Sequence, residues 1–462
     1  MEPENLRFGG GAADTLLHPL VAVGMVLAII LILCLPRKYA VAPLLLSIFT
    51  IPIAQVVVLA GIHFTVLRIL ILAGLVRWAV SRRPSTGGMF IGGFNSIDRV
   101  VALWTVLATI VFSLQWMQTQ AVIKSLGNFL DALGGYLVLR FLIQDVEDVK
   151  RAIKVFAVIS LIVGACMINE QVTHRNIFGL LGGVGITPAV REGKTRAQGA
   201  FAVYIDAGVF GGILIPFFIW LWKAAKSRVA AALGLVGATA MTLASNSSTS
   251  QLAYAAGIVG LCLWPMRKRM RLLRRGFVLT LIALHLVMKA PVWALIARID
   301  LTGSSSGYHR FELVDNCIRH FTDWWFLGYR NYDTWGWDMW DLSNQFVAVA
   351  LTGGLVTLAL FIAILSRSFA GLGNARKAVE GRVEEWFLWS LGAALFANVV
   401  AFFGCSYMAQ MQMAFFALLA MISVAIFEAT QFVVVPADTI DEVFVPSLTG
   451  RVANQHPIAS IR

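Results

Sequence analysis

Charged side chains are scarce in this sequence, and their scarcity excludes a large class of proteins. Asp, Glu, Lys and Arg make up 13% of the 462 residues, whereas 58% of the residues are hydrophobic. Soluble domains carry roughly twice that share of charge. A chain so poor in charge cannot form a water-soluble globule, and its mean hydropathy of +0.77 indicates a membrane protein.

Cysteine is rare as well, and no catalytic motif of the soluble enzymes is present. The five cysteines are far apart and form neither a Cys-x-x-Cys pair nor a Cys/His cluster, which excludes a disulfide framework and a zinc-type site. The sequence also lacks a P-loop and a Rossmann glycine fingerprint. We therefore expect no metal and no cofactor.

Long apolar runs fill most of the chain, and each run of about 20 residues is long enough to cross a bilayer as a helix. We predict an all-α polytopic membrane protein with about 12–13 transmembrane helices in a single bundle over residues 16–430. The predicted spans are 16–35, 39–60, 62–80, 100–117, 121–143, 152–168, 200–222, 229–245, 249–265, 276–296, 344–365, 386–403 and 407–429.

The basic residues orient this bundle. The net charge of +12 would suggest nucleic acid for a soluble protein, but here much of the excess lies in short loops, so we expect a lipid bilayer and no nucleic acid as partners. The run Arg267–Arg275 predicts a cytoplasmic loop. Because successive spans alternate in direction, five more basic loops should lie on the same cytoplasmic side: Arg37–Lys38, Arg82–Arg83, Lys150–Arg151, Lys223–Arg228 and Arg376–Arg382. We expect residues 1–15 to face outward and the tail 431–462 to face the cytoplasm. The first residues lack the basic region of a signal peptide, so we expect the first span to remain as a helix.

Two long loops fall on the outer side, at about 169–199 and 297–343. Both carry several arginines, which runs against the usual charge bias of outer loops. An anionic ligand is one cause, because arginine binds phosphate through two parallel hydrogen bonds. Pairing with the acidic residues of the same loops is the other. Arg68 is a separate candidate for a lipid phosphate, because it lies inside the predicted span 62–80, where a charge costs at least about 2.5–3.5 kcal/mol.

The stretch from Gly303 to Gly354 is the one long polar and aromatic segment of the chain. It supplies histidines and carboxylates suited to proton transfer, among them His309 and Asp341. Its tryptophans, including Trp324 and Trp325, offer flat faces that pack against sugar rings. An interfacial aromatic belt would also enrich tryptophan here, so the aromatic residues alone do not decide the function.

Three segments carry a family resemblance. Segment 195–217, TRAQGAFAVYIDAGVFGGILIPF, has an arginine followed by Gly and Phe before a span. Segment 304–330 has Ser-Gly, an aromatic residue, His-Arg, and then Trp-Trp and Gly. Segment 341–357 matches a motif in which His and then Asn, Ser or Gln are followed, after nine intervening residues, by Gly-x-x-(Gly/Thr/Tyr). Asn344, Gly354 and Thr357 fit that spacing. Together they resemble the O-antigen ligase and O-antigen polymerase superfamily, in particular its exopolysaccharide-polymerase-like branch.

The resemblance implies a metal-independent membrane glycosyltransferase of the GT-C-like kind, multi-pass in the bacterial inner membrane, with its active site facing the periplasm. Its donor would be a polyprenyl-diphosphate-linked oligosaccharide and its acceptor a glycan on a lipid carrier, with other envelope polysaccharide assembly proteins as further partners. Ser343 stands where the ligases have their histidine. This departure favours a polymerase over an O-antigen ligase that transfers glycan to lipid A-core.

The resemblance also implies roles for individual residues. Asp341 replaces the missing histidine as the base for the acceptor hydroxyl, and His309 is the second candidate. Arg310 is the first choice for neutralising the charge of the departing diphosphate, the task that a metal performs elsewhere. The expected substrate-binding residues are Arg191, Arg196, Arg68, Arg319, Trp324, Trp325 and Asn344.

Two other functions stay open at the level of sequence. The protein could be a flippase for lipid-linked sugars, which makes no bond, or a sugar-binding scaffold without activity. Transporter sites usually lie near the middle of the membrane, within broken helices of paired repeats. Here the polar residues concentrate in two loops on one side, which argues for the enzyme.

Overall fold

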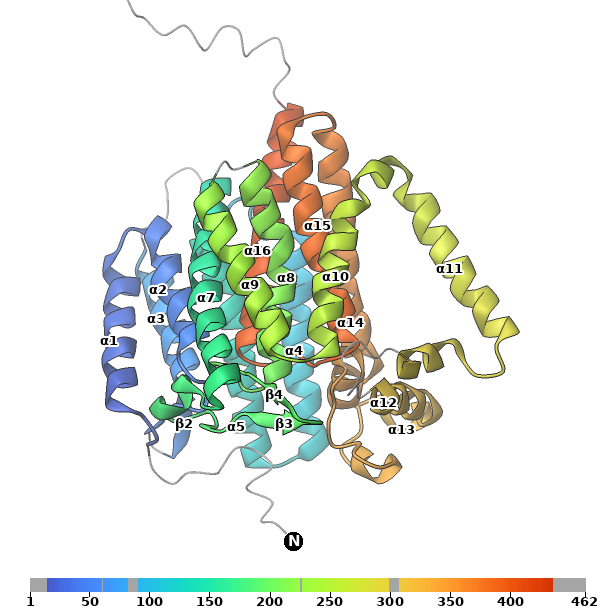
Figure 1. The fold of residues 1–462 in the computed structure, drawn as a ribbon, viewed down its shortest axis with the longest axis horizontal. Coiled ribbons are helices and arrows are strands. Elements are labelled where there is room, and N and C mark those ends of the chain that lie inside the picture. Colours follow the sequence, from blue (N-terminus) through green and yellow to red (C-terminus); the bar gives the residue numbers. More distant parts are fainter. Residues whose placement is uncertain (1–14, 60, 82–89, 225–226, 299–306, 435–462) are drawn as a thin grey trace, which may run out of the picture.

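The computed structural model describes residues 15–59, 61–81, 90–224, 227–298 and 307–434. These residues form a helical bundle with two short β-hairpins (Figure 1). The predicted all-α membrane architecture is confirmed. Most of the predicted outer segment 1–15, the basic pair Arg82–Arg83 and the tail beyond residue 434 lie outside the described residues.

The first half of the chain contributes seven α-helices and four short strands. Their bounds are α1 (Pro19–Cys34), α2 (Arg37–Thr50), β1 (Val56–Leu59), β2 (Ile62–Thr65), α3 (Val66–Val80), α4 (Ser96–Trp116), α5 (Thr119–Phe129), the π-helical segment η2 (Leu130–Gly134), α6 (Gly135–Leu142), α7 (Val146–Thr173), the 3-10 turn η3 (Ile177–Leu181), β3 (Ala189–Arg191) and β4 (Lys194–Arg196).

The second half contributes the remaining helices. Their bounds are α8 (Tyr204–Lys223), α9 (Arg228–Ala244), α10 (Ser248–Cys262), η4 (Trp264–Arg269), α11 (Met270–Val287), η5 (Val292–Arg298), α12 (Gly307–Arg319), α13 (Phe321–Trp324), η6 (Tyr332–Trp335), α14 (Gln345–Ala378), α15 (Val383–Phe402) and α16 (Gln410–Val434). Short helices therefore occupy much of the predicted outer loop 297–343.

Seven helices within the described residues are long and apolar enough to cross a membrane. They are α4, α5 with η2 and α6, α7, α8, α14, α15 and α16, and the bent pair of η4–α11 with η5 makes eight if it is one span. The other predicted spans coincide with shorter helices, so the count of 12–13 stays a prediction. The span predicted over 39–60 is shorter than expected, because the β-branched residues 56–58 pair with β2 as an antiparallel hairpin.

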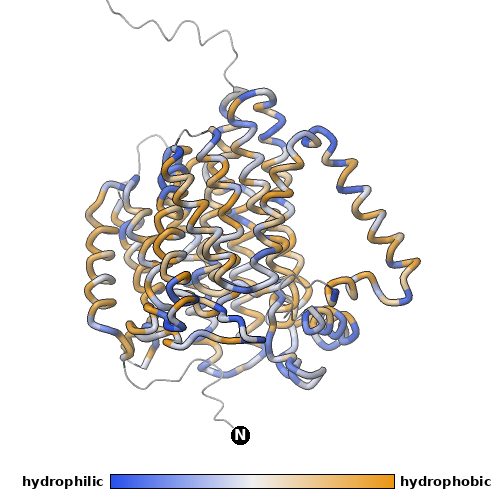
Figure 2. The backbone as a smooth tube through the Cα atoms, viewed as in Figure 1, coloured by the Kyte–Doolittle hydropathy of each residue, from blue (hydrophilic) through white to orange (hydrophobic). Residues whose placement is uncertain are grey.

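Hydropathy divides the bundle into an apolar middle and two polar ends (Figure 2). We call the end that carries β3, β4, α12 and α13 the loop end, and the opposite end the basic end (Figure 1). Helix α8 runs through the interior, and 83% of the residues in its most apolar stretch are buried. Small residues let its neighbours approach closely: a Cβ on Gly211 would lie 2.5 Å from the carbonyl oxygen of Ala238 in α9.

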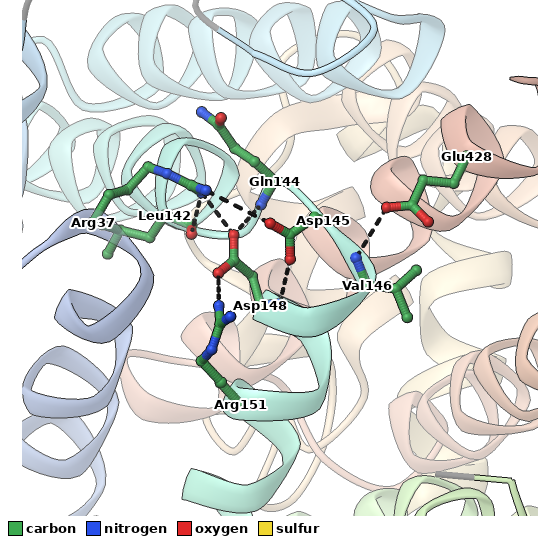
Figure 3. A network of polar contacts seen from close by, with 8 residues as sticks. All are labelled: Arg37, Leu142, Gln144, Asp145, Val146, Asp148, Arg151 and Glu428. Atoms are coloured by element: carbon green, nitrogen blue, oxygen red, sulfur yellow. Dashed lines mark hydrogen bonds and ion pairs between the residues drawn. The ribbon is translucent and has the colours of Figure 1, made fainter. Parts of the chain in front are cut away.

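Ion pairs occupy the arginines of the basic end. Asp148 accepts hydrogen bonds from Arg37 at 2.7 Å and from Arg151, at the start of α7 (Figure 3). Glu385 of α15 likewise accepts from Arg267 at 2.9 Å and Arg376 at 2.7 Å. The basic loops thus have structural partners, in agreement with their assignment to topology rather than catalysis.

Helix α11 stands apart from the bundle (Figure 1). None of its residues is buried, and its main contacts are with η4 and η5 at its two ends. Large apolar side chains, including Phe277 and Leu286, are exposed on it. It meets η5 at a bend of 92°. In a bilayer these side chains would face lipid.

Candidate functional site

Arg196 and Arg310 come together at the loop end, although 114 positions separate them. The residues close enough to Arg310 to influence its pKa are Cys405, Tyr204, Asp341 and Arg196. We call these five residues the arginine site. Segments from both predicted outer loops contribute to it. The structure thus unites Arg196, Arg310 and Asp341, three of the predicted site residues.

The β3–β4 hairpin places two arginines of the same loop in different environments. Glu192 and Gly193 form its two-residue turn, and both have positive φ, as a type I′ turn requires. Arg191 stands beside this turn and is exposed. Arg196 lies at the other end of the hairpin, paired with Ala189, and is buried. The hairpin therefore directs Arg196, and not Arg191, into the protein.

Buried polar side chains from several helices hold the segment that follows Arg196. Glu170 of α7 accepts hydrogen bonds from the backbone N–H groups of Gln198 and Gly199 at 3.1 and 3.0 Å. Asn176 donates to the Gly199 carbonyl at 2.8 Å, and Gln410 of α16 donates to the Ala200 carbonyl at 3.3 Å. Because these bonds are buried, they are costly to break and fix the path of the segment into α8.

Arg196 uses this framework to contact the first residue of α8. Its guanidinium donates a hydrogen bond to the Tyr204 hydroxyl and lies over the Tyr204 ring, 4.7 Å from the ring centroid. Stacking on the aromatic face, together with the hydrogen bond, holds the Arg196 guanidinium in one position. The pair gives the arginine site a fixed cation on a rigid helix end.

Arg310 is on α12 and is 6% exposed. Burial, and then the nearby Arg196, lower its pKa, while Cys405, Tyr204 and Asp341 act in the opposite direction. No described residue forms a hydrogen bond or an ion pair with its guanidinium, and its Nε is buried without a partner. A buried cation without a counter-ion costs several kcal/mol, so this geometry favours an anionic ligand.

His309 and Asp341 lie beside Arg310. The His309 Nε2 lies 2.9 Å from the Asp341 backbone carbonyl oxygen and 3.8 Å from the Asp341 carboxylate. The carboxylate is 47% exposed, so a substrate can reach it. Burial first, and then Asp338, raise the pKa of Asp341, whereas His309 and Arg310 lower it. A carboxylate with a raised pKa near a positive pocket is suited to proton transfer.

Polar atoms without partners gather around these residues. Within the described chain, buried polar atoms that lack a hydrogen bond include His309 Nδ1, Arg310 Nε, Ser343 Oγ and Asn344 Nδ2. Asn344 also caps α14, because its Oδ1 accepts from the N–H groups of Phe346 and Val347. Unsatisfied buried donors are uncommon in proteins and favour a polar ligand or water at this place.

A break in α14 supports the loop after α12. Gly354 has φ of +72° and interrupts the helix, and the Leu355 N–H then donates to the Trp325 carbonyl at 2.8 Å. A Cβ on Gly354 would lie 2.5 Å from the Phe326 carbonyl oxygen. Only glycine fits both the backbone conformation and the contact. The glycine of the 341–357 motif therefore has a structural task, which is to seat the Trp-Trp loop.

Other predicted site residues have different surroundings. Arg68 pairs with Asp131 in the π-helical segment at 3.0 Å, and Arg319 pairs with Asp315 at 2.7 Å while 72% exposed. The Trp324 indole is buried and donates to the Cys317 carbonyl, whereas Trp325 is exposed. No recorded contact joins these four residues to the arginine site within the described chain.

Sequence reasoning missed Tyr204, Cys405 and Tyr407. Tyr407 lies in the loop between α15 and α16. Its hydroxyl donates to the Asn398 Oδ1 at 3.0 Å, and its backbone N–H donates to the Gln345 Oε1. Burial raises the pKa of the Cys405 thiol and the Tyr407 phenol well above their ordinary values. These residues stand among apolar neighbours in the sequence, and only the fold brings the α15–α16 loop to Arg310.

Two further observations bound the site. No group of three or more His, Cys, Asp or Glu residues suited to a metal ion occurs among the residues that the structure describes. A hollow of about 650 Å³ lies at the basic end of α8, lined by Lys223, Trp264 and Trp386 among others. Its lining is mostly apolar and offers no arginine, so we place the candidate site at the loop end instead.

Comparison of the chain with protein-family models and with curated proteins found no match.

Proposed function

We propose that this protein is a membrane glycosyltransferase that polymerises or transfers oligosaccharide repeat units linked to a polyprenyl diphosphate. The observation that carries the proposal is Arg310, a buried guanidinium without a described partner that lies in the field of a second buried arginine. Two adjacent arginines repel each other, and an anion bound between them offsets that repulsion. A diphosphate offers the charge and the several acceptor oxygens that both can bind.

The proposal gives the following roles to the residues of this region. Arg310 and Arg196 hold the diphosphate and neutralise the charge that develops on it as the sugar leaves. Asp341 takes the proton from the acceptor hydroxyl, with His309 setting its position and lowering its pKa. Asn344 supplies a nearby polar group for glycan hydroxyls. The exposed Trp325 and Trp337 offer faces for the sugar rings.

The resemblance to O-antigen polymerases and exopolysaccharide polymerases supports a polymerase rather than a ligase. Ser343 cannot act alone as the base that the ligase histidine provides. The donor and the acceptor would then both be glycans on lipid carriers, and the active site would face the periplasm from the inner membrane. Other polysaccharide assembly proteins of the envelope would be partners.

The direct test is reconstitution. Purified protein in liposomes is incubated with lipid-linked repeat units, and the glycans are separated by size. Longer chains support the polymerase, and transfer to added lipid A-core indicates the ligase. Movement of the lipid-linked sugar across the bilayer without lengthening indicates a flippase, and no change at all leaves a scaffold.

Orientation needs its own measurement. A cysteine is introduced at His320 in a background where the exposed Cys34 and Cys262 are replaced by serine. Labelling of intact cells by a membrane-impermeant thiol reagent is expected, because the loop end should face outward. Labelling only after the membrane is opened would place the arginine site in the cytosol and contradict the proposal.

A further inference from the structure

A second hollow, of about 450 Å³, lies between α7 and α9 near the basic end. Its lining has two parts of different chemistry. Apolar side chains, among them Ala157, Val158 and Leu233, form one part, and the cations Lys154 and Arg228 belong to the other. Ligand sites commonly have volumes of about 300–1,000 Å³, so this hollow is large enough to hold part of a small molecule.

The two helices that form the hollow are packed tightly a short way along their length. A Cβ on Gly164 of α7 would lie 2.6 Å from the Gly237 carbonyl oxygen of α9, and a Cβ on Gly237 would lie 2.4 Å from the Ser160 carbonyl oxygen. Lys154 and Arg228 lie about two helical turns from this contact, toward the basic end. Because the backbones of α7 and α9 touch there, the two walls of the hollow are held at a fixed separation.

The two cations of the hollow have no partner of opposite charge. Within the part of the chain that the structure describes, no ion pair or hydrogen bond involves the side chain of Lys154 or Arg228. Lys150, one turn away on α7, pairs instead with Glu147. Most other cations near this end are paired in the same way, so the hollow is distinguished by two charges that lack a counter-ion.

The end of α9 does not compensate the charge of Arg228. Arg228 is the first residue of this helix, where the helix dipole favours an acidic residue over a basic one. The first turn of α9 contains no acidic residue, and the Ser227 side chain forms no capping hydrogen bond. The helix end therefore adds to the positive charge of the hollow.

The two cations also mark the level at which both helices become apolar. Residues 155–169 of α7 and 229–244 of α9 include no charged residue. A basic residue at such a boundary extends its charged end to the interface between water and lipid. Beyond the cations, Val158 and Leu233 are 47% and 41% exposed, as expected of side chains that face acyl chains. The charged and the apolar parts of the hollow thus follow the two parts of a phospholipid.

We propose that this hollow binds an anionic phospholipid of the surrounding bilayer. The phosphate lies between Lys154 and Arg228, and arginine can donate two parallel hydrogen bonds to it. One acyl chain lies along Ala157, Val158 and Leu233. Basic pockets between membrane helices bind anionic headgroups on this principle. A zwitterionic headgroup fits less well, because its ammonium group offsets the charge that the two cations lack. Lipid binding here is independent of glycan transfer at the loop end.

The test measures binding of two lipids that have the same acyl chains. Purified protein in neutral detergent is titrated with phosphatidylglycerol and with phosphatidylethanolamine, and bound lipid is counted by native mass spectrometry. Wild-type protein should bind phosphatidylglycerol more tightly. A basic residue near an anionic headgroup contributes about fivefold in affinity, so the double variant Lys154→Gln, Arg228→Gln should lose roughly 25-fold for phosphatidylglycerol. Equal affinity of wild type for the two lipids would overturn the proposal.

Lys150→Gln is the matched control for charge. It removes one positive charge from α7, one turn from Lys154, but at a lysine that is already paired with Glu147. Its affinity for phosphatidylglycerol should equal that of wild type. Equal losses in Lys150→Gln and Lys154→Gln would show that only the net charge of this end matters, and would refute a specific site.

A change of shape tests the apolar part of the hollow without altering charge. Ala230 lines the hollow, so Ala230→Phe should fill it and weaken binding of phosphatidylglycerol. Val236→Phe, at an exposed position of α9 outside the hollow, is the control for size and should bind as wild type does. Wild-type binding by a folded Ala230→Phe variant would contradict the assigned place. If Ala230→Phe does not fold, the charge variants at exposed positions decide alone.

Thermal unfolding separates a lipid from a soluble anion. A molecule that binds only the folded state raises Tm, so phosphatidylglycerol should raise the Tm of wild-type protein more than that of the double variant. Glycerol 3-phosphate carries a phosphate without acyl chains and should have little effect at the same concentration. An equal rise of Tm with glycerol 3-phosphate would make the hollow a site for a soluble phosphate and would overturn the lipid assignment.

Discussion

The Trp293 indole donates a 3.0 Å hydrogen bond to the Asp315 carboxylate and so joins η5 to the helix that carries Arg310. Asp315 is largely buried and also pairs with Arg319. Through this bond, α12 takes part of its position from the α11–η5 arm. The predictions below concern the residues that α12 and its neighbours bring together.

Replacing Arg310 by alanine should nearly abolish glycan transfer. The change removes a cation that stabilises the leaving group, and removal of one such donor typically costs about 10²–10³ in kcat. Arg310→Lys keeps the charge but loses the planar fork, so an intermediate rate is expected. Polymer formed in cells and in liposomes is measured beside protein amount. Arg175→Ala, at an exposed arginine of the same end of the bundle, is the control, and a loss as large as that of Arg310→Ala would refute a specific role.

Asp341→Asn should be far more damaging than Ser343→Ala. The first change removes the proposed base and should lower the transfer rate by roughly 10²–10⁴-fold. The second removes a buried hydroxyl that has no hydrogen-bond partner, so a rate close to wild type is expected. The initial transfer rates of the two variants are compared at saturating donor and acceptor. Mild and equal effects would remove Asp341 from the mechanism.

The acid limb of the pH profile should report Asp341. Burial raises the pKa of this carboxyl group, and a base acts only when ionised, so transfer should fall as the pH drops through a value above the usual range for aspartate. His309 lowers the pKa of Asp341. His309→Gln should therefore move the acid limb to higher pH. Rates of wild type and His309→Gln across pH test this, and a shift to lower pH would contradict the assigned contact.

Glu170→Ala should destabilise the protein and reduce transfer together. It leaves the Gln198 and Gly199 N–H groups buried without their acceptor, and each such group costs about 1–3 kcal/mol. The loosened segment carries Arg196, so binding of the diphosphate should weaken as well. Thermal unfolding in detergent and the KM for donor are the measurements. Glu147→Ala, at an exposed acid of the same helix, should change neither, and equal behaviour of the two variants would argue against this framework.

The membrane architecture was predictable because apolar runs and basic loops follow directly from the cost of charge in lipid. Arg310 and Asp341 were selected from the polar stretch 303–354 through the family resemblance, and their roles stay predictions. The hairpin at β1–β2 was not predicted, because β-branched residues such as Val56 are equally common in apolar helices and strands. Periodicity alone does not separate the two in short runs.

The pairing of residues distant in sequence was the larger gap. Arg191 and Arg196 look equivalent in the sequence, yet the turn at Glu192 and Gly193 exposes one and buries the other. Arg68 looked like an unpaired membrane charge, and its partner Asp131 lies 63 positions away in the π-helical segment.

The isolation of α11 gives the surrounding bilayer a mechanical part in this protein. In a bilayer the exposed apolar side chains of α11 would face acyl chains, and the far end of this helix turns through η5 into the Trp293–Asp315 bond. Membrane thickness sets the tilt of such a rod. We therefore expect the position of the helix that carries Arg310 to respond to acyl-chain length, so that the transfer rate differs between short-chain and long-chain lipids.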